Sequence, residues 1–543
     1  MKPPAWICAL LLLLAGGIAY HNSLSGGFVF DDLPATRDNP SLGTPWSLTA
    51  FSPPANSGVG GRPLANFSFA LNRFMGGAEV RGYHAFNLLL HLGSALLLFG
   101  IVRRTSADAA PAFLIALAWT IHPSATAAVS YISQRTELLM AFFHLLTLYA
   151  FVREWRAVSV AACALGMLSK ESMVAAPLVV LLYDRTFVSG TFRAAWRQRS
   201  RYYVGLGLTW LALGVSLLTR LDQRGVGFSL GVTPWQYALA ECEAVVRYAC
   251  LALWPAPLVF DYGRIYPGLT ARIVVSGALL ACALWQTFKA LRRRSPAGFA
   301  AAVFFLVLAP TSTFVPVADQ PIAENRMYLP LAAVVVLLAM AVRAVAGSRL
   351  RPVLLLGCVA LTALTIARND VYRTPVGLWQ DTVRKRPQNP RAQFNAGVVL
   401  LDAGRVAEAL PRFERALQLK PSYAEAHNSL GNALVQLGRT LEAFPHYAAA
   451  VRLKPDYARA WYNYGTARLQ GGDAQASIPL FAEALRLEPG SAEAHNNLGN
   501  AYFQRDQPAL AIPHYERALQ LDPQLAEAHF NCGNACLELG RAD

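Results

Sequence analysis

The chain has 543 residues, of which 54% are hydrophobic and 15% charged, and its formal net charge is +15. This charge does not indicate a nucleic-acid partner, because the basic residues fall mainly in short segments between apolar stretches, the pattern that sets membrane topology. The eight cysteines give no disulfide framework, since six lie in or beside apolar stretches, where Cys behaves as a small hydrophobe. The length leaves room for a large membrane domain and one soluble domain.

The apolar stretches lie before residue 368 and predict a multispanning helical domain over residues 1–368. The first stretch lacks the small-residue end of a signal-peptide cleavage site, so we expect an uncleaved anchor. Several stretches are shorter than the roughly 20 residues of a straight span. We expect about eleven spans, near residues 5–20, 85–102, 109–130, 137–152, 157–169, 172–188, 202–219, 271–290, 298–317, 327–345 and 352–367.

The basic segments between these stretches predict the orientation of the domain. Segment 236–254 contains Glu241, Glu243 and Arg247, which are costly in lipid, so we interpret it as an interfacial or re-entrant helix. The amino terminus then lies inside, whereas the long first loop, 21–84, and everything after Arg368 lie on the extracytoplasmic side. This side is the periplasm if the chain is in a bacterial inner membrane, and the lumen if it is in the endoplasmic reticulum.

Charged residues gather at this extracytoplasmic edge of the membrane. Ionisable groups at membrane depth are candidates for function, although each can also be an interfacial anchor or one half of a structural ion pair. The residues are Asp31, Asp32, Arg62, Arg135, Lys170, Glu171, Asp261, Glu324 and Arg326.

A strict 34-residue period begins after a predicted linker helix at 369–387. Pro387, Pro421, Pro455, Pro489 and Pro523 keep this period, and so do Gly397, Gly431, Gly465, Gly499 and Gly533. A helix–turn–helix unit of this length, with small residues where helices touch and Pro at its exit, is typical of tetratricopeptide repeats. Residues 388–543 therefore predict an α-solenoid of four full repeats and one half, which makes the whole fold all-α.

Asparagines recur beside the periodic glycines on the first helix of the repeats. Stacking would arrange them as a ladder of amides, which can bind a peptide backbone without reading its side chains; equally, they can simply solvate a helix face. A similar ladder lines the groove of the nucleocytoplasmic O-linked N-acetylglucosamine transferase, which favours peptide capture as a hypothesis. The candidates are Asn395, Asn463, Asn497 and Asn531 before the glycine and Asn432, Asn500 and Asn534 after it.

An ordered set of motifs resembles the transmembrane and tetratricopeptide-repeat O-mannosyltransferase family and its bacterial relatives. The set covers nearly the whole chain: GGFVFDD (26–32), GRPLANFSFALN (61–72), GYHAFNLLLH (82–91), HPSATAAVSYISQRTELL (122–139), SKES (169–172) and AENRMYLP (323–330), followed by the repeats. The resemblance implies a GT-C glycosyltransferase fold with an extracytoplasmic active site. It also implies a polyprenyl-phosphate sugar donor, expected to be mannose-linked, a Ser or Thr hydroxyl acceptor on a protein, and inversion at the anomeric carbon.

The same resemblance assigns expected roles to the charged residues. Inversion by a single displacement needs one carboxylate base, and either Asp31 or Asp32 is the candidate, unless this pair merely caps a loop helix before Pro34. Cations that stabilise the departing lipid phosphate are expected at Arg135, Lys170 and Arg326, and also at Arg62. The remaining candidates either line the site or pack around it: His122, Glu171, Glu324, Tyr328, Tyr83 and His84.

The chain departs from the family at one motif. Where relatives read HP-x-H-T-E-A-V, this sequence has Ala125 and Ala127, so one His and one Glu are missing. No metal-binding motif occurs, and we predict no required metal and no cofactor beyond the lipid-linked sugar substrate. Two other functions stay open: a GT-C transferase acting on a lipid or polysaccharide, and a non-catalytic membrane scaffold that presents the repeats to partner proteins.

Overall fold

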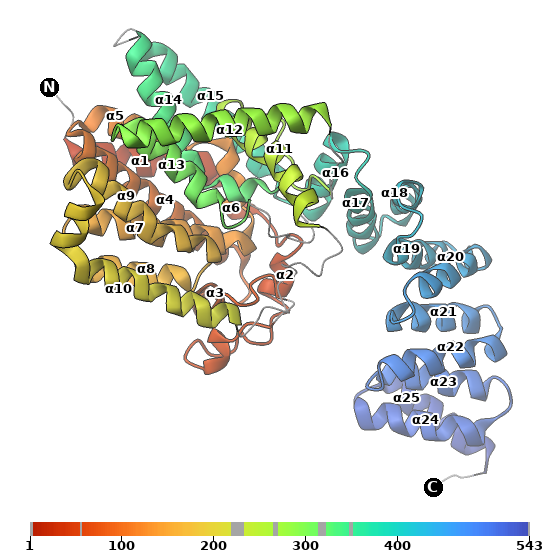
Figure 1. Cartoon of the computed structure of the whole chain (residues 1–543). Helices are drawn as coiled ribbons and strands as arrows, with labels where there is room; N and C mark the ends of the chain where they lie inside the picture. The colour runs from red at the N-terminus through yellow and green to blue at the C-terminus, as the bar shows by residue number, and fades with distance from the viewer. Residues whose placement is uncertain are drawn as a thin grey trace. The chain divides into compact units, whose positions relative to one another are not determined.

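The computed structural model describes residues 4–54, 57–218, 233–263, 270–312, 322–346 and 351–540, with the backbone alone at 216–218, 346 and 351–355. Every regular element in these ranges is a helix (Figure 1). The all-α prediction is confirmed. The chain divides into two compact units, Met1–Lys385 and Arg386–Asp543.

The first unit is a bundle of long and short helices. In Figure 1, α4, α7, α8 and α10 lie side by side across the bundle. The helices are α1 (Ala5–Tyr20), α2 (Asp32–Ala35), α3 (Pro63–Gly76), α4 (Val80–Ser106), α5 (Ala109–Thr120), α6 (Thr126–Val129), α7 (Arg135–Val152), α8 (Arg156–Met167), α9 (Ala176–Tyr183), α10 (Phe192–Leu218), α11 (Pro234–Leu253), α12 (Ala271–Arg292), α13 (Pro296–Leu308), α14 (Pro330–Ala346), α15 (Arg351–Val371) and α16 (Pro375–Lys385).

Several of these helices can cross a membrane. Within the described ranges, four helical segments are long and apolar enough: Ala5–Ser25, Val80–Ser106, Ile132–Val152 and Ala271–Arg292. A fifth crossing is formed if Ala109–Thr120 and Pro123–Val129, bent by 54°, act as one span. Other apolar helices, such as α8 with 12 residues and α13 with 13, are shorter than the roughly 20 residues of a straight span. The expected total of eleven stays a prediction, and residues 219 and 313–317 of the expected spans lie outside the described ranges.

The core of the first unit contains a buried polar contact between two helices and the turn before α14. The His91 ring on α4 lies 2.7 Å from the Tyr328 hydroxyl, and the Trp119 indole N–H on α5 donates to the Tyr328 carbonyl at 2.9 Å. All three side chains are fully buried. Because each polar group has a partner, these large residues can fill the core without the cost of an unsatisfied hydrogen bond.

The second unit contains four helix pairs and one further helix. They are α17 (Pro390–Asp402) with α18 (Val406–Leu419), α19 (Ala424–Gln436) with α20 (Thr440–Leu453), α21 (Ala458–Gln470) with α22 (Ala474–Leu487), α23 (Ala492–Phe503) with α24 (Pro508–Leu521), and α25 (Ala526–Glu538). The periodic glycine of each pair faces an aromatic ring on the second helix. At Gly431 an added Cβ would come within 2.7 Å of the Tyr447 ring. Glycine therefore allows the two helices of a repeat to approach closely.

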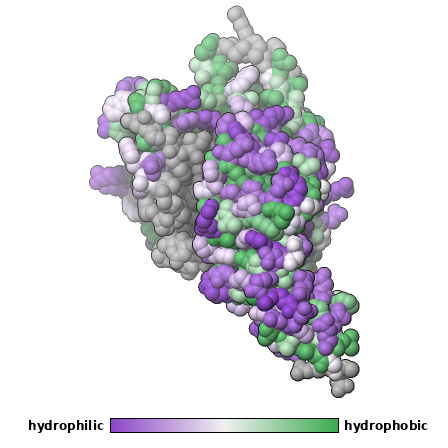
Figure 2. All heavy atoms as spheres, turned by 90° about the vertical axis from the view of Figure 1, so that its right-hand side faces the viewer, coloured by the Kyte–Doolittle hydropathy of each residue, from purple (hydrophilic) through white to green (hydrophobic). Residues whose placement is uncertain are grey.

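The outer surface of the repeats is mixed in polarity. On the face turned to the viewer in Figure 2, hydrophilic side chains predominate, with smaller hydrophobic patches between them. This pattern is ordinary for a solvated helical array, in which single apolar side chains at the surface need no special explanation.

Candidate active site

The two acidic residues of the first loop have different surroundings. Asp32 is fully buried, and its two carboxyl oxygens accept backbone N–H groups of Val29 at 3.0 Å and Ser133 at 2.7 Å. Burial raises the pKa of the Asp32 carboxyl to about 8, although these backbone donors act in the opposite direction. Asp31 is only partly buried, and its backbone N–H donates to the Tyr131 hydroxyl at 3.1 Å. Asp32 thus holds the loop against the 131–133 segment, and Asp31 is the more accessible carboxylate.

Asp31 lines a small, mostly polar pocket. Its other lining residues come from segments that are far apart in the sequence: Ala127, Tyr131, Gln134, Val259, Phe260, Glu324, Asn325 and Tyr372. Two amides on its wall are joined, because the Asn325 side chain donates to the Gln134 side chain at 2.7 Å. The pocket therefore combines carboxylates, amides and aromatic rings, which can contact hydroxyl groups, and its volume of about 40 Å³ admits only part of a sugar-sized ligand.

The two alanines that depart from the family motif lie in different places. Ala127 lines the pocket beside Asp31, whereas Ala125 is fully buried in the core of the bundle. His122 is also buried, and its Nδ1 accepts the backbone N–H of Ser124 at 3.2 Å, which matches a turn formed with Pro123. Because Ala127 stands where relatives have Glu, the pocket wall has no carboxylate at position 127.

Three of the four candidate phosphate-binding cations are paired with carboxylates. Lys170 Nζ lies 2.5 Å from Glu137, and the Arg62 guanidinium lies 3.3 Å from Glu171. Arg326 lies 3.5 Å from Glu241, whose pKa is raised to about 7 because burial outweighs the attraction of Arg326. A phosphate would have to compete with these carboxylates, and their binding role stays a prediction.

Arg135 has a different environment from the other cations. Its guanidinium is fully buried and donates to the Asn87 side chain at 2.7 Å and to the carbonyl oxygens of Tyr83 and Ser68 at 2.9 and 3.2 Å. It also lies 4.4 Å from the centre of the Phe69 ring. These neutral contacts join α3, α4 and α7, so Arg135 packs the base of the first loop, and phosphate binding would require them to be exchanged.

The aromatic and histidine candidates pack inside the protein. Tyr83 is buried with its hydroxyl 3.4 Å from the Gly77 carbonyl, and Tyr328 lies in the core described above. His84 lies so close to Gly26 that a Cβ there would come within 2.9 Å of its ring nitrogen. None of these three lines the pocket beside Asp31. Of the other predicted residues, only Glu324 does.

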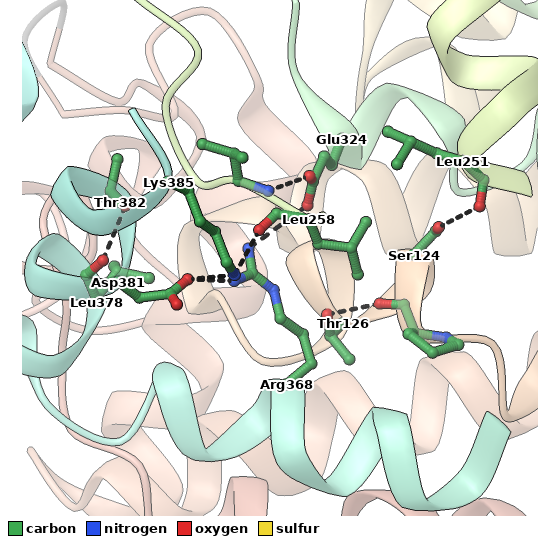
Figure 3. Close-up of polar contacts among 12 residues, drawn as sticks. Ser124, Thr126, Leu251, Leu258, Glu324, Arg368, Leu378, Asp381, Thr382 and Lys385 are labelled. Carbon is green, nitrogen blue, oxygen red and sulfur yellow. Dashed lines mark hydrogen bonds and ion pairs between the residues drawn. The ribbon is translucent and has the colours of Figure 1, made fainter. Parts of the chain in front are cut away.

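A buried ion network that the sequence did not reveal supports one wall of the pocket (Figure 3). Arg368 donates to Asp381 at 3.0 Å and pairs with Glu324 at 3.5 Å. Lys385 donates to Asp381 at 2.6 Å and to the Leu258 carbonyl at 2.8 Å. Glu324 in turn accepts the Val259 N–H and the Tyr262 hydroxyl. The network fixes the 258–262 loop, which carries Phe260 on the pocket wall.

The asparagines of the repeats take part in contacts within and between repeats. Asn463 donates to Asn428 and Asn531 donates to Asn496, each at 3.0 Å, so the column before the glycine links successive first helices. After the glycine, Asn432 and Asn500 accept the hydroxyls of Tyr447 and Tyr515. Among the described contacts, Asn395 and Asn534 have no side-chain hydrogen bond of this kind. Peptide binding by the ladder stays a prediction.

Comparison with known proteins agrees with this architecture. Family models for the tetratricopeptide repeat match residues 376–424, 400–458, 428–492 and 492–525. "Protein O-mannosyl-transferase F38B6.6" of Caenorhabditis elegans is 25% identical over 456 residues, which cover 77% of this chain and 63% of that protein. "Protein O-mannosyl-transferase TMTC4" of Mus musculus is 26% identical over 491 residues, 75% of this chain and 66% of that protein.

The chain is a relative of the protein O-mannosyl-transferases. It spans about two thirds or less of the length of the curated relatives it matches. Among solved structures, a MamA protein aligns with 30% of this chain at 21% identity and a TM-score of 0.27. YrrB, described as "a TPR protein with an unusual peptide-binding site", aligns with 35% of this chain at 21% identity and a TM-score of 0.28.

The sequence similarity to the O-mannosyl-transferases extends over both units. The alignments cover about three quarters of the chain, which is more than the first unit contains. Sequence reasoning overlooked Gln134, Glu137 and Asn325, although all three lie inside the family-like motifs at 122–139 and 323–330. It also overlooked Arg368, Asp381 and Lys385. A charged residue at the end of an apolar stretch, followed by further charges at helical spacing, is the signal that points to them.

Proposed function

We propose that this protein is a membrane glycosyltransferase that transfers a sugar, mannose, from a polyprenyl-phosphate donor to Ser or Thr hydroxyls of protein acceptors. The observation that carries the proposal is the pocket at Asp31, most of whose lining residues lie in the segments 26–32, 122–139 and 323–330 that resemble the family, in a chain that aligns over 77% of its length with an O-mannosyl-transferase. The site lies on the extracytoplasmic face of a membrane body with eleven spans. That face is the bacterial periplasm or the lumen of the endoplasmic reticulum.

Asp31 is the base of the proposed reaction. The acceptor hydroxyl oxygen attacks the anomeric carbon, its proton passes to Asp31, and the bond from that carbon to the phosphate oxygen breaks. Asp32 is less suited to this role, because both its oxygens already accept backbone N–H groups and its pKa of about 8 leaves it largely protonated at neutral pH. A base must be ionised to accept a proton.

The leaving polyprenyl phosphate carries negative charge that needs a cation nearby. We assign this role to Arg326, which directly follows the pocket residues Glu324 and Asn325 and whose partner Glu241 has a pKa raised to about 7. Lys170, Arg62 and Arg135 then act indirectly, by holding the segments that carry Glu137, Glu171 and Asn87. The repeats hold the acceptor polypeptide.

A scaffold without activity is the second candidate, favoured by Ala127, which removes an expected carboxylate from the pocket wall. Transfer of radiolabelled mannose from polyprenyl-phosphate-mannose to envelope protein separates the two functions. The transferase predicts labelled protein with the wild type and none with Asp31→Asn. Labelled lipid or polysaccharide instead of protein would change the acceptor class. Absence of transfer from mannose and other donor sugars, with the protein folded and inserted, would favour the scaffold.

A further inference from the structure

The first helices of the last three repeats form a pocket that the proposed reaction does not use. Its volume is about 280 Å³, and it is partly open to solvent. Helices α21 and α23 supply most of its wall, and the start of α25 closes it. The lining residues are Tyr462, Thr466, Leu469, Gln470, Glu493, Asn496, Asn497, Leu525 and Glu527.

Two carboxylates in this pocket have no basic partner. Glu493 and Glu527 are exposed, and within the described part of the chain no Lys, Arg or His side chain forms an ion pair with either. Both carboxylates influence the Tyr462 hydroxyl. Burial raises the pKa of Tyr462, and the negative charges of Glu493 and Glu527 raise this pKa further. The two negative charges therefore converge on the pocket, although the chain as a whole is strongly basic.

The equivalent carboxylate two repeats earlier is different. Glu425 lies 68 residues before Glu493 and pairs with Lys454 at 2.9 Å. The acidic charge is thus neutralised at Glu425, whereas for Glu493 the position equivalent to Lys454 is occupied by Asp522. Since an uncompensated pair of like charges is unfavourable, an external cation between them lowers the energy of the pocket.

The remaining walls suit a long side chain. Leu469 and Leu525 offer apolar contact, whereas Asn497 donates to the Tyr462 hydroxyl at 3.1 Å and lies 3.4 Å from the Thr466 hydroxyl. Arg and Lys side chains combine an aliphatic stem with a cationic end, so they match a pocket lined by both leucines and carboxylates.

We propose that this pocket binds an Arg or Lys side chain of an extended polypeptide segment. The cationic end lies between Glu493 and Glu527, and the stem packs against Leu469 and Leu525. The exposed Gln470 side chain, which also lines the pocket, can then meet the backbone of the segment. That the segment belongs to a glycosyl acceptor rests on the function proposed above; the binding itself does not.

The test measures binding of short fluorescein-labelled peptides to the full chain in detergent by fluorescence anisotropy. One peptide of Ser, Thr and Gly contains a single Arg, and a matched peptide contains citrulline, which has nearly the same shape without the charge. We expect the Arg peptide to bind roughly five-fold more tightly at low salt, and added salt to remove the difference. The double variant Glu493→Gln/Glu527→Gln should bind both peptides equally.

The matched control is Glu425→Gln, whose charge is already paired with Lys454, and it should keep the preference for Arg. Equal binding of the two peptides by the wild type would overturn the proposal, and so would an undiminished preference in the double variant. No sugar donor is present in this assay. A negative binding test therefore does not contradict the reaction proposed at Asp31. A negative transfer assay does not contradict binding at the pocket of Glu493 and Glu527.

Discussion

Asp31 and Asp32 are adjacent in sequence, but the turn of the chain between them gives them different tasks. Asp32 points inward and receives two backbone N–H groups, whereas Asp31 lines the pocket with Glu324 and two amides. A carboxyl group can accept through both oxygens in either protonation state. An amide can accept through only one, so the two positions should respond differently to Asn.

We therefore expect Asp31→Asn to abolish sugar transfer without changing the melting temperature of the protein. Asp32→Asn should lose one of its two backbone hydrogen bonds and destabilise the first unit by about 1–2 kcal/mol. Transfer assays and thermal unfolding of both variants in the same detergent separate these effects. If Asp32→Asn melted like the wild type and transferred nothing, Asp32 would be the base and the assignment to Asp31 would be wrong.

Asp381 gives a prediction that depends on pH. It accepts from Arg368, Arg384 and Lys385, and the hydrogen bond from Lys385 and the charge of Arg368 outweigh burial and hold its pKa below the usual range. A lowered pKa means that Asp381 stabilises the fold above its unfolded pKa, near 3.9, and that this contribution is lost as the pH falls through the folded value.

Asp381→Asn should accordingly cost the first unit about 3 kcal/mol near neutral pH, because it leaves the buried Arg368 without this partner. The cost should shrink as the pH falls below about 4, because the unfolded chain binds the proton there, whereas folded Asp381 loses its charge only at a still lower pH. The change in the free energy of unfolding is measured by following tryptophan fluorescence during unfolding, to which Trp379 on the same helix contributes. A cost that stays constant down to pH 3 would show that packing, and not charge, is what Asp381 provides.

At the scale of single elements, the helix pairs of the repeats depend on glycine against an aromatic ring. Gly431→Ala would place a methyl group 2.7 Å from the buried Tyr447 ring, which is closer than real contacts allow. We expect this overpacking to destabilise α19 and α20 by about 1–3 kcal/mol. Hydrogen exchange in the full chain reports the local free energy of opening.

Gly533 supplies the matched control in the same column. It lies on α25, and nothing approaches within 4 Å of an added Cβ. Gly533→Ala should therefore stabilise its helix by about 0.5–1 kcal/mol, since Ala is the better helix former. Equal effects at the two glycines would contradict this assignment, because the substitution would then act through helix propensity alone and not through contact with the ring.

The repeats could be predicted from the sequence because their contacts are local and periodic. Gly397 and Phe413 meet within one unit of 34 residues, and the same spacing recurs in the next three units. The candidate site was harder to predict. Its ion pairs join residues far apart in the chain, as Arg62 does with Glu171, and no local pattern reveals such a partner. Sequence could mark Asp31 and Asp32 as a pair, but only the backbone geometry distinguishes them.

At the scale of the whole molecule, the distribution of arginine predicts which side of the membrane each part occupies. Arg193 belongs to the basic run 185–201, which the positive-inside rule places in the cytoplasm, whereas Arg505 lies among the repeats, which we expect on the opposite side. Both side chains are exposed. They therefore form a matched pair of reporters, because the same chemical change can be made at each without disturbing a buried contact.

Arg193→Cys and Arg505→Cys, each in a background without other cysteines, should react differently with a membrane-impermeant maleimide. In sealed right-side-out vesicles we expect label at position 505 only, and label at both positions once detergent opens the vesicles. Inverted vesicles provide the control, with the opposite result. Label at 193 alone in right-side-out vesicles would place the repeats in the cytoplasm, together with the pocket at Asp31, whose wall is supported by Asp381 and Lys385 directly before the repeats. The proposed extracytoplasmic side of sugar transfer would then be wrong.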